Sequence, residues 1–132
     1  MKNNSDFKFD LMVGRTYEER LGHIFDNKKI EVKTDFMAHT TGNIAVEYMC
    51  RGKPSGIATT HADYYAYIIP RASCKEIVLL MSVSELKKLS RLYYKQGKIK
   101  AMGDSNQSLA VLIPLVNLFK LSQDGEAKED EC

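Results

Sequence analysis

The sequence lacks the features of a membrane-spanning or secreted protein. The longest apolar runs in its 132 residues, such as LAVLIPLV at 109–116, are far too short to cross a bilayer. The N-terminal stretch MKNNSDFKFD has no apolar core of the kind that a secretory signal needs. We therefore expect a cytoplasmic protein without a membrane partner.

The sequence is also poor in cysteine, and it contains no internal repeat. Its three cysteines, Cys50, Cys74 and Cys132, show neither pairing nor metal-ligand spacing, which predicts reduced thiols and no structural zinc site. The length predicts a single domain over residues 1–122, in which 1–13 form a partly ordered arm.

Charge is distributed unevenly along the chain. Residues 123–132, QDGEAKEDEC, hold five acidic residues and one lysine, and we expect a solvated, disordered tail there. Without this tail the chain has 18 basic and 12 acidic residues, a net charge of +6 compared with +2 for the whole. A moderately basic body is compatible with a polyanionic partner.

Hydrophobic periodicity predicts a mixed α/β domain with one central mixed sheet flanked by helices. Ser82 has the features of a helix N-cap, and Thr60 with Asp63 resembles a capping box. The predicted elements are a helix at 16–22, a β-hairpin from 23–25 and 28–35, strands at 43–50, 75–82 and 109–114, and helices at 61–69, 82–97 and near 115–119.

The predicted strand KKIEVKTD, residues 28–35, alternates charged side chains with apolar or small ones. Successive strand side chains point to opposite faces, so Glu31, Lys33 and Asp35 share one side. A carboxylate can hold Mg²⁺ together with waters and phosphate oxygens. A lysine beside it can orient an attacking water and offset charge on a phosphate. This combination indicates metal-dependent phosphodiester hydrolysis.

The run IEVKTD, with the downstream segments TGN…E and PSGI, resembles the PD-(D/E)xK nuclease superfamily of restriction endonucleases, Holliday-junction resolvases and phage recombination nucleases. The resemblance covers roughly residues 14–118 and is strongest to small stand-alone members of bacteriophage and other mobile elements. It implies a restriction-endonuclease-like core of order α-β-β-β-α-β, and an endonuclease that acts on DNA with Mg²⁺ or Mn²⁺ inside a host cell.

The resemblance assigns roles to single residues. Glu31 matches the metal-binding acidic residue of the ExK element and Lys33 its lysine. A helical glutamate often precedes these in the family, and Glu19 or Glu18 takes that place, with Glu19 as the catalytic candidate.

The second acidic metal ligand has two candidates. The family's aspartate usually lies about ten residues before ExK, whereas Asp26 lies only five before Glu31, near the tip of the predicted hairpin, where a turn role is the alternative. The other candidate is Glu47 in strand 43–50, which an antiparallel neighbour would bring close to Glu31. In that arrangement Met49 stands where the family has lysine, and Lys33 supplies the ammonium from the next strand.

Three further residues are candidates for contact with nucleic acid. Arg51 and Lys53 flank a glycine in a loop, where they either meet phosphates or are ordinary surface charges. His39, in the loop MAHTTGN, is a candidate for contact with the substrate.

These observations predict a small metal-dependent endonuclease. With little room for a recognition domain, cleavage selective for branched DNA is expected over the reading of a long sequence, and a homodimer with two sites would suit such a substrate. The alternatives are a catalytically inactive nuclease-fold module that binds nucleic acid, and a relative that cleaves RNA. Convergence of the acidic groups at 19, 26, 31 and 47 would favour the enzyme.

Overall fold

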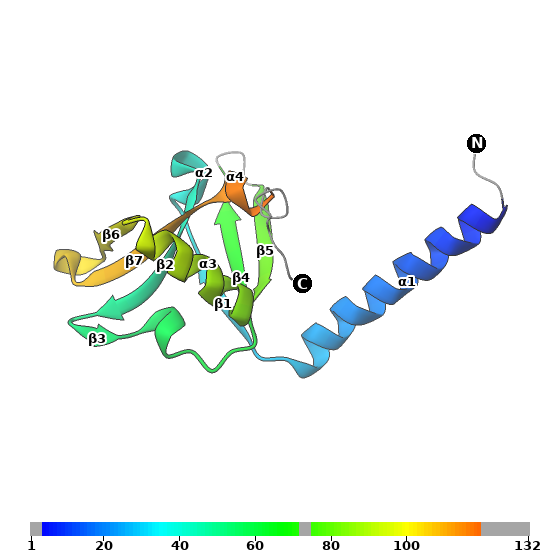
Figure 1. Ribbon diagram of the computed structural model, residues 1–132, viewed down its shortest axis with the longest axis horizontal. Helices are drawn as coiled ribbons and strands as arrows, with labels where there is room; N and C mark the ends of the chain where they lie inside the picture. The colour runs from blue at the N-terminus through cyan, green and yellow to red at the C-terminus, as the bar shows by residue number, and fades with distance from the viewer. Residues whose placement is uncertain (1–3, 72–74, 120–132) are drawn as a thin grey trace.

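The strands of this protein form two sheets that diverge from a common core (Figure 1). The structure is a computed structural model and describes residues 4–71 and 75–119. Sheet A has the order β1-β4-β5, and sheet B has the order β3-β2-β7-β6. Their bounds are β1 Ile30–Thr34, β2 Asn43–Cys50, β3 Lys53–Pro54, β4 Tyr64–Pro70, β5 Glu76–Ser82, β6 Ile99–Met102 and β7 Ser108–Pro114.

Sheet A is mixed and sheet B is antiparallel. In sheet A, β1 runs parallel to β4 and places Glu31 opposite Tyr65, while β5 runs antiparallel to β4. In sheet B, β2 lies between β3 and β7. The mixed α/β class is therefore confirmed, but the strands fall into two hydrogen-bonded sheets where we expected one.

The core lies where the inner faces of both sheets meet helix α3 (Val83–Lys95). Ile44 and Val46 of β2 and Ile113 of β7 are fully buried and contribute one side of it. Tyr65 of β4 and Leu86 of α3 pack from the other side, and each of these two side chains is 1% exposed or less. Alternation along β2 explains its burial, because every second side chain points into this core.

Helix α3 begins where its sequence predicts. The Ser82 hydroxyl accepts a hydrogen bond of 3.2 Å from the amide of Glu85, which otherwise lacks a partner inside the helix. Replacing Ser82 by alanine is expected to lower the free energy of unfolding by about 1 kcal/mol, as measured by urea denaturation. Lys88→Ala, at an exposed position inside the same helix, is the control; an equal loss there would show that the cap is not responsible.

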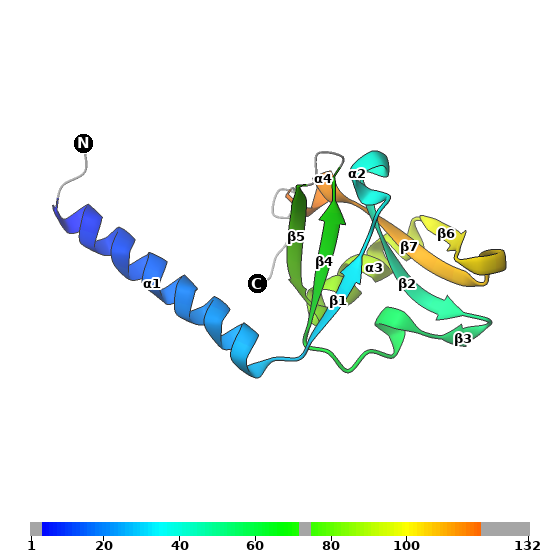
Figure 2. The ribbon, with the colours of Figure 1, turned by 180° about the vertical axis from the view of Figure 1, so that it is seen from behind.

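Helix α1 (Asn4–Asn27) extends away from both sheets (Figures 1 and 2). It is longer than the helix predicted at 16–22 and includes residues 4–13 of the predicted arm. The predicted hairpin around Asp26 and Asn27 is wrong, since both residues belong to α1. The Asn27 side chain donates to the carbonyl of His23, and the amide of Lys28 donates to the carbonyl of Ile24, so this segment continues helical hydrogen bonding where we had predicted a turn.

The helix predicted at 61–69 is also wrong, because Tyr64–Pro70 form the central strand β4. Thr60 does not open a helix: its hydroxyl accepts from the amide of Ala62, two residues on. Asp63 instead accepts a hydrogen bond of 2.9 Å from the amide of Lys29. Tyrosine and isoleucine favour a strand, and pairing on both sides of β4 overrides the weak capping signal.

The remaining predicted elements agree with the structure to within a residue or two. The strand at 43–50 is β2, that at 75–82 is β5, and that at 109–114 is β7. Three short helices complete the description, namely α2 (Ala38–Thr41), α4 (Leu115–Leu118) and the 3₁₀ turn η1 (Gly56–Ala58), with a second 3₁₀ turn η2 at Asp104–Asn106. Within the described ranges, no helix combines the length and apolarity needed to cross a membrane. The acidic tail lies outside the described residues.

Candidate functional site

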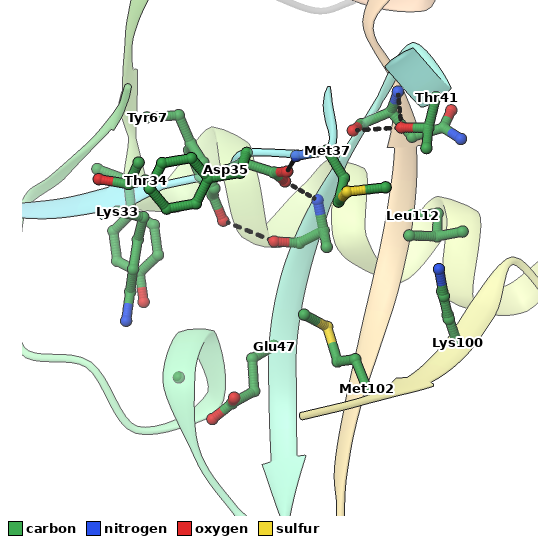
Figure 3. Close-up of a pocket in the computed structure, with 15 residues that line it drawn as sticks. Lys33, Thr34, Asp35, Met37, Thr41, Glu47, Tyr67, Lys100, Met102 and Leu112 are labelled. Atoms are coloured by element: carbon green, nitrogen blue, oxygen red, sulfur yellow. Dashed lines mark hydrogen bonds between the residues drawn. The ribbon is translucent and has the colours of Figure 1, made fainter. Parts of the chain in front are cut away.

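A cleft opens between the two sheets where β1 faces β2 (Figure 3). Its volume is about 380 Å³. Polar side chains from both sheets line it. They are Lys33 in β1, Asp35 directly after β1, Glu47 in β2, Tyr65 and Tyr67 in β4, and Lys100 in β6. The cleft therefore gathers side chains that lie up to 79 positions apart in the chain, from 33 to 112.

Glu31 and Lys33 form an ion pair on the inner face of β1. Lys33 Nζ lies 2.9 Å from Glu31 Oε2. The Thr60 hydroxyl donates a hydrogen bond of 2.7 Å to the other carboxylate oxygen, Oε1. Glu31 does not itself line the cleft, but this pair joins it to Lys33, which does. Both partners are partly exposed, so solvent screens their attraction and leaves them accessible to a ligand.

This pairing keeps both groups charged. The hydrogen bond from Lys33 lowers the pKa of Glu31, partial burial opposes the shift, and the Thr60 hydroxyl adds to it. In the same way Glu31 raises the pKa of Lys33, and the carboxylate of Glu47 contributes to that increase. Glu47 is therefore within electrostatic reach of the ammonium group, although it belongs to the other sheet.

Glu47 reaches the cleft by a route that the sequence did not predict. Its strand, β2, pairs with β3 and β7, so the expected antiparallel pairing with the strand of Glu31 is wrong. The side chain is on the opposite face of β2 from buried Val46 and lines the cleft. The Ser55 hydroxyl donates a hydrogen bond of 2.8 Å to Glu47 Oε2 and fixes its orientation.

Asp35 connects three segments at the end of β1. Its Oδ1 accepts hydrogen bonds from the amides of Met37 and Ala38, which start α2. Its Oδ2 accepts a hydrogen bond of 3.0 Å from the amide of Ala45 in β2. This carboxylate thus ties sheet A to sheet B beside the cleft. Of the two roles that its sequence position allows, metal ligand or loop cap, the contacts support the cap.

Two tyrosines of β4 complete the wall. The Tyr67 hydroxyl donates to the carbonyl of Ala45 at 3.3 Å, and burial raises the pKa of this phenol well above its ordinary value. The Tyr65 hydroxyl is buried, and among the described residues it makes no hydrogen bond of good geometry. Burial raises the pKa of Tyr65, and the nearby negative charge of Glu31 raises it further. A buried hydroxyl without a partner is costly, and one beside a charged pair in a cleft indicates a place for a polar ligand.

Sequence reasoning missed Tyr65, Thr60 and Lys100. The first two were hidden by the incorrect helix at 61–69, and the alternation of aromatic and aliphatic residues there could have identified them. Lys100 lies on β6, which we did not predict.

The structure does not bring the other predicted site residues to the cleft. Glu19 and Asp26 lie on the exposed helix α1 and do not line it. His39 lies in α2, not in a loop, and lines a separate depression together with residues of α4.

Arg51 and Lys53 lie at the hairpin that joins β2 to β3 and are exposed. Arg51, with φ of 52°, and Gly52 form its tight turn, and the Arg51 guanidinium donates to the side chain of Gln107 at 2.7 Å. Neither basic residue lines the cleft, so contact of this hairpin with nucleic acid stays a prediction.

The donor set at the cleft suits a hard cation in part. Across the described ranges, no three His, Cys, Asp or Glu side chains are arranged to hold a metal. Mg²⁺, however, is commonly held by one or two protein carboxylates with waters and phosphate oxygens. Glu31 and Glu47 supply two carboxylates near Lys33, and the Tyr65 hydroxyl is a further oxygen, one that makes no well-formed hydrogen bond within the part of the chain that the structure describes.

No family model, curated protein or solved structure matches this chain.

Proposed function

We propose that the protein is a small metal-dependent endonuclease that hydrolyses DNA phosphodiester bonds, built on a restriction-endonuclease-like core. The observation that carries the proposal is the Glu31–Lys33 pair, held at 2.9 Å beside a cleft that also contains the Glu47 carboxylate. The buried Tyr65 hydroxyl supports it, because it lacks a hydrogen bond of good geometry within the described ranges and a phosphate oxygen or a bound water would satisfy that group.

Four residues in or beside the cleft have distinct roles in this proposal. Glu31 and Glu47 would hold one or two Mg²⁺ or Mn²⁺ ions, which supply Lewis-acid stabilisation of charge on the phosphate when bound. Lys33 stays protonated because Glu31 raises its pKa, so it orients the attacking water by donating hydrogen bonds and offsets phosphate charge. Thr60 holds the Glu31 carboxylate in place by its hydrogen bond to Oε1.

The substrate in this proposal is DNA of a phage or mobile element in the host cytoplasm. The body of the chain is basic, and Lys100 places a second cation at the cleft. Arg51 and Lys53 would contact phosphates away from the cleavage point. A chain of this size leaves little room for a recognition domain, so branched DNA is the preferred substrate in the proposal, and a homodimer would present two sites to it.

The first test of the proposal is metal removal. Plasmid, single-stranded and four-way-junction DNA are incubated with the wild-type protein and Mn²⁺, Mg²⁺ or EDTA. We expect cutting with either metal and none with EDTA, and the preferred substrate identifies the class of nuclease. Cleavage that persists at full rate in EDTA would contradict a metal-dependent mechanism.

A second candidate function is nucleic-acid binding without catalysis. The observation that favours it is that both oxygens of Glu31 are already engaged by Lys33 and Thr60. Tight binding of DNA without cleavage in the presence of any metal would favour this binding function over the nuclease. A matched panel of RNA substrates tests the third reading, an RNA-cleaving relative, because metal-assisted hydrolysis itself does not require a particular sugar.

A further inference from the structure

Helix α1 carries an apolar stripe that nothing in the described structure covers. At 3.6 residues per turn, five large side chains fall within one arc of the helix, and each is between 46% and 59% exposed. We call this set the α1 stripe: Phe7, Leu11, Tyr17, Leu21 and Phe25. So much exposed apolar surface on one helix face marks an interaction site.

Sheet A has an apolar face that is also uncovered. Alternation along the three strands sends the charged and aromatic cleft residues inward and a second set outward, away from α3. We call the second set the outer face: Ile30, Val32, Ala66, Ile68, Val78 and Leu80. Figure 2 shows β1, β4 and β5 from this side with no helix in front of them. A sheet with a parallel pair normally has both faces covered.

The helix of the same chain is held away from this face. Between α1 and β1 lie only Lys28 and Lys29. The amide of Lys28 continues the hydrogen bonding of α1, while Lys29 donates to the Asp63 carboxylate and its carbonyl accepts from the amides of Asp63 and Tyr64. These bonds fix the chain where α1 meets β1, and α1 extends away from the outer face of its own copy, which leaves the stripe open to another molecule (Figures 1 and 2).

We propose that two copies of this chain form a symmetric dimer in which α1 of each copy lies on the outer face of sheet A of the other. The 24 residues of α1 span about 36 Å, whereas the seven residues of β4 span about 23 Å, so the helix can cover the strands and still bridge the two bodies. The outer face carries no charged side chain at its centre, which suits burial against an apolar surface.

The area available is sufficient for a stable dimer. The aromatic residues of the stripe are each 59% exposed, so each can bury a further area of about 90–150 Å², and each copy contributes both a helix face and a sheet face. The sum is on the order of the 800 Å² per partner that specific interfaces bury. The surface and its test are independent of the proposed nuclease activity.

The test is the molar mass of the full chain in solution, by light scattering and sedimentation at micromolar concentration. We expect twice the chain mass of 15.0 kDa for the wild type. Leu11→Asp on the stripe and Val78→Asp on the outer face should each yield monomers, weakening association at least about 100-fold, because each would bury an unpaired carboxylate. Met12→Asp, on the opposite side of α1 and equally exposed, should remain dimeric.

Mixing the two monomeric variants identifies the arrangement. In a mixed dimer one of the two helix–sheet contacts has both its helix and its sheet unaltered, so equal amounts of Leu11→Asp and Val78→Asp should re-form dimers. A monomeric wild type would overturn the proposal. So would a Val78→Asp protein that stays dimeric, since the helices would then pair without the sheet. A mixture that stays monomeric would overturn it as well, because the unaltered helix–sheet contact should restore association.

Discussion

Replacing Glu31 by glutamine is expected to reduce metal-dependent DNA cleavage by a factor of about 10²–10³, the range for loss of one group that stabilises transition-state charge. Glutamine has nearly the same shape and keeps a carbonyl oxygen that can accept from Thr60. The change removes the negative charge that would hold the metal and that raises the pKa of Lys33. Initial rates on the preferred DNA substrate, with far-UV circular dichroism as a check of folding, measure the effect.

Two acidic residues of α1 provide the control. Glu19→Gln and Asp26→Asn make the same chemical change at positions that the sequence suggested for the site but that the structure places on the exposed helix. Both variants should retain wild-type rates. Loss of activity in either of them, or full activity in Glu31→Gln, would refute the assignment of the cleft.

Replacing Gly56 by alanine is expected to lower the free energy of unfolding by about 2–4 kcal/mol, because a bulky group is forced into a packed and strained position. A Cβ at Gly56 would lie 2.3 Å from the backbone oxygen of Glu47 and 2.9 Å from its carbonyl carbon. The φ of +53° adds a penalty for any residue with a side chain. Since the clash falls on Glu47, we also expect the cleft to be distorted. Urea denaturation followed by tyrosine fluorescence measures the first effect.

Gly52 separates the two causes. It also has a positive φ, +77°, but a Cβ there would meet no atom within 4 Å. Gly52→Ala should therefore cost only the backbone term of about 1 kcal/mol. If Gly56→Ala is no more destabilising than Gly52→Ala, the close approach of η1 to β2 is not what positions Glu47.

Local sequence signals, such as a helix N-cap or strand alternation, correctly predicted several elements. Ser82 and the periodicity after it gave α3, and the alternation around Val46 gave β2. They failed for β4, where a short polar signal at Thr60 and Asp63 suggested a helix cap. Asp63 instead binds the amide of Lys29, 34 residues earlier, and a contact at that separation leaves no mark in a local window.

The site was predictable to the extent that it lies on one strand. The Glu31–Lys33 pair follows from the two-residue period of β1 alone. Glu47 was a candidate on the correct face, but the sheet to which its strand belongs could not be read from the sequence. Glu19 and Asp26 were misplaced because the helix continues to Asn27 and leaves the body of the protein.

The pairing of the strands also determines when the cleft can form during synthesis. Pairing of β1 with β4 joins positions 34 residues apart, and pairing of β2 with β7 joins Asn43 to Pro114. Contacts of such long range close late and slowly in folding. A nascent chain lacking β7 has only the β2–β3 pair of the second sheet, because β7 joins β2 to β6, so the far wall is incomplete. The cleft can therefore exist only after nearly the whole domain has been translated, so a growing polypeptide cannot display it.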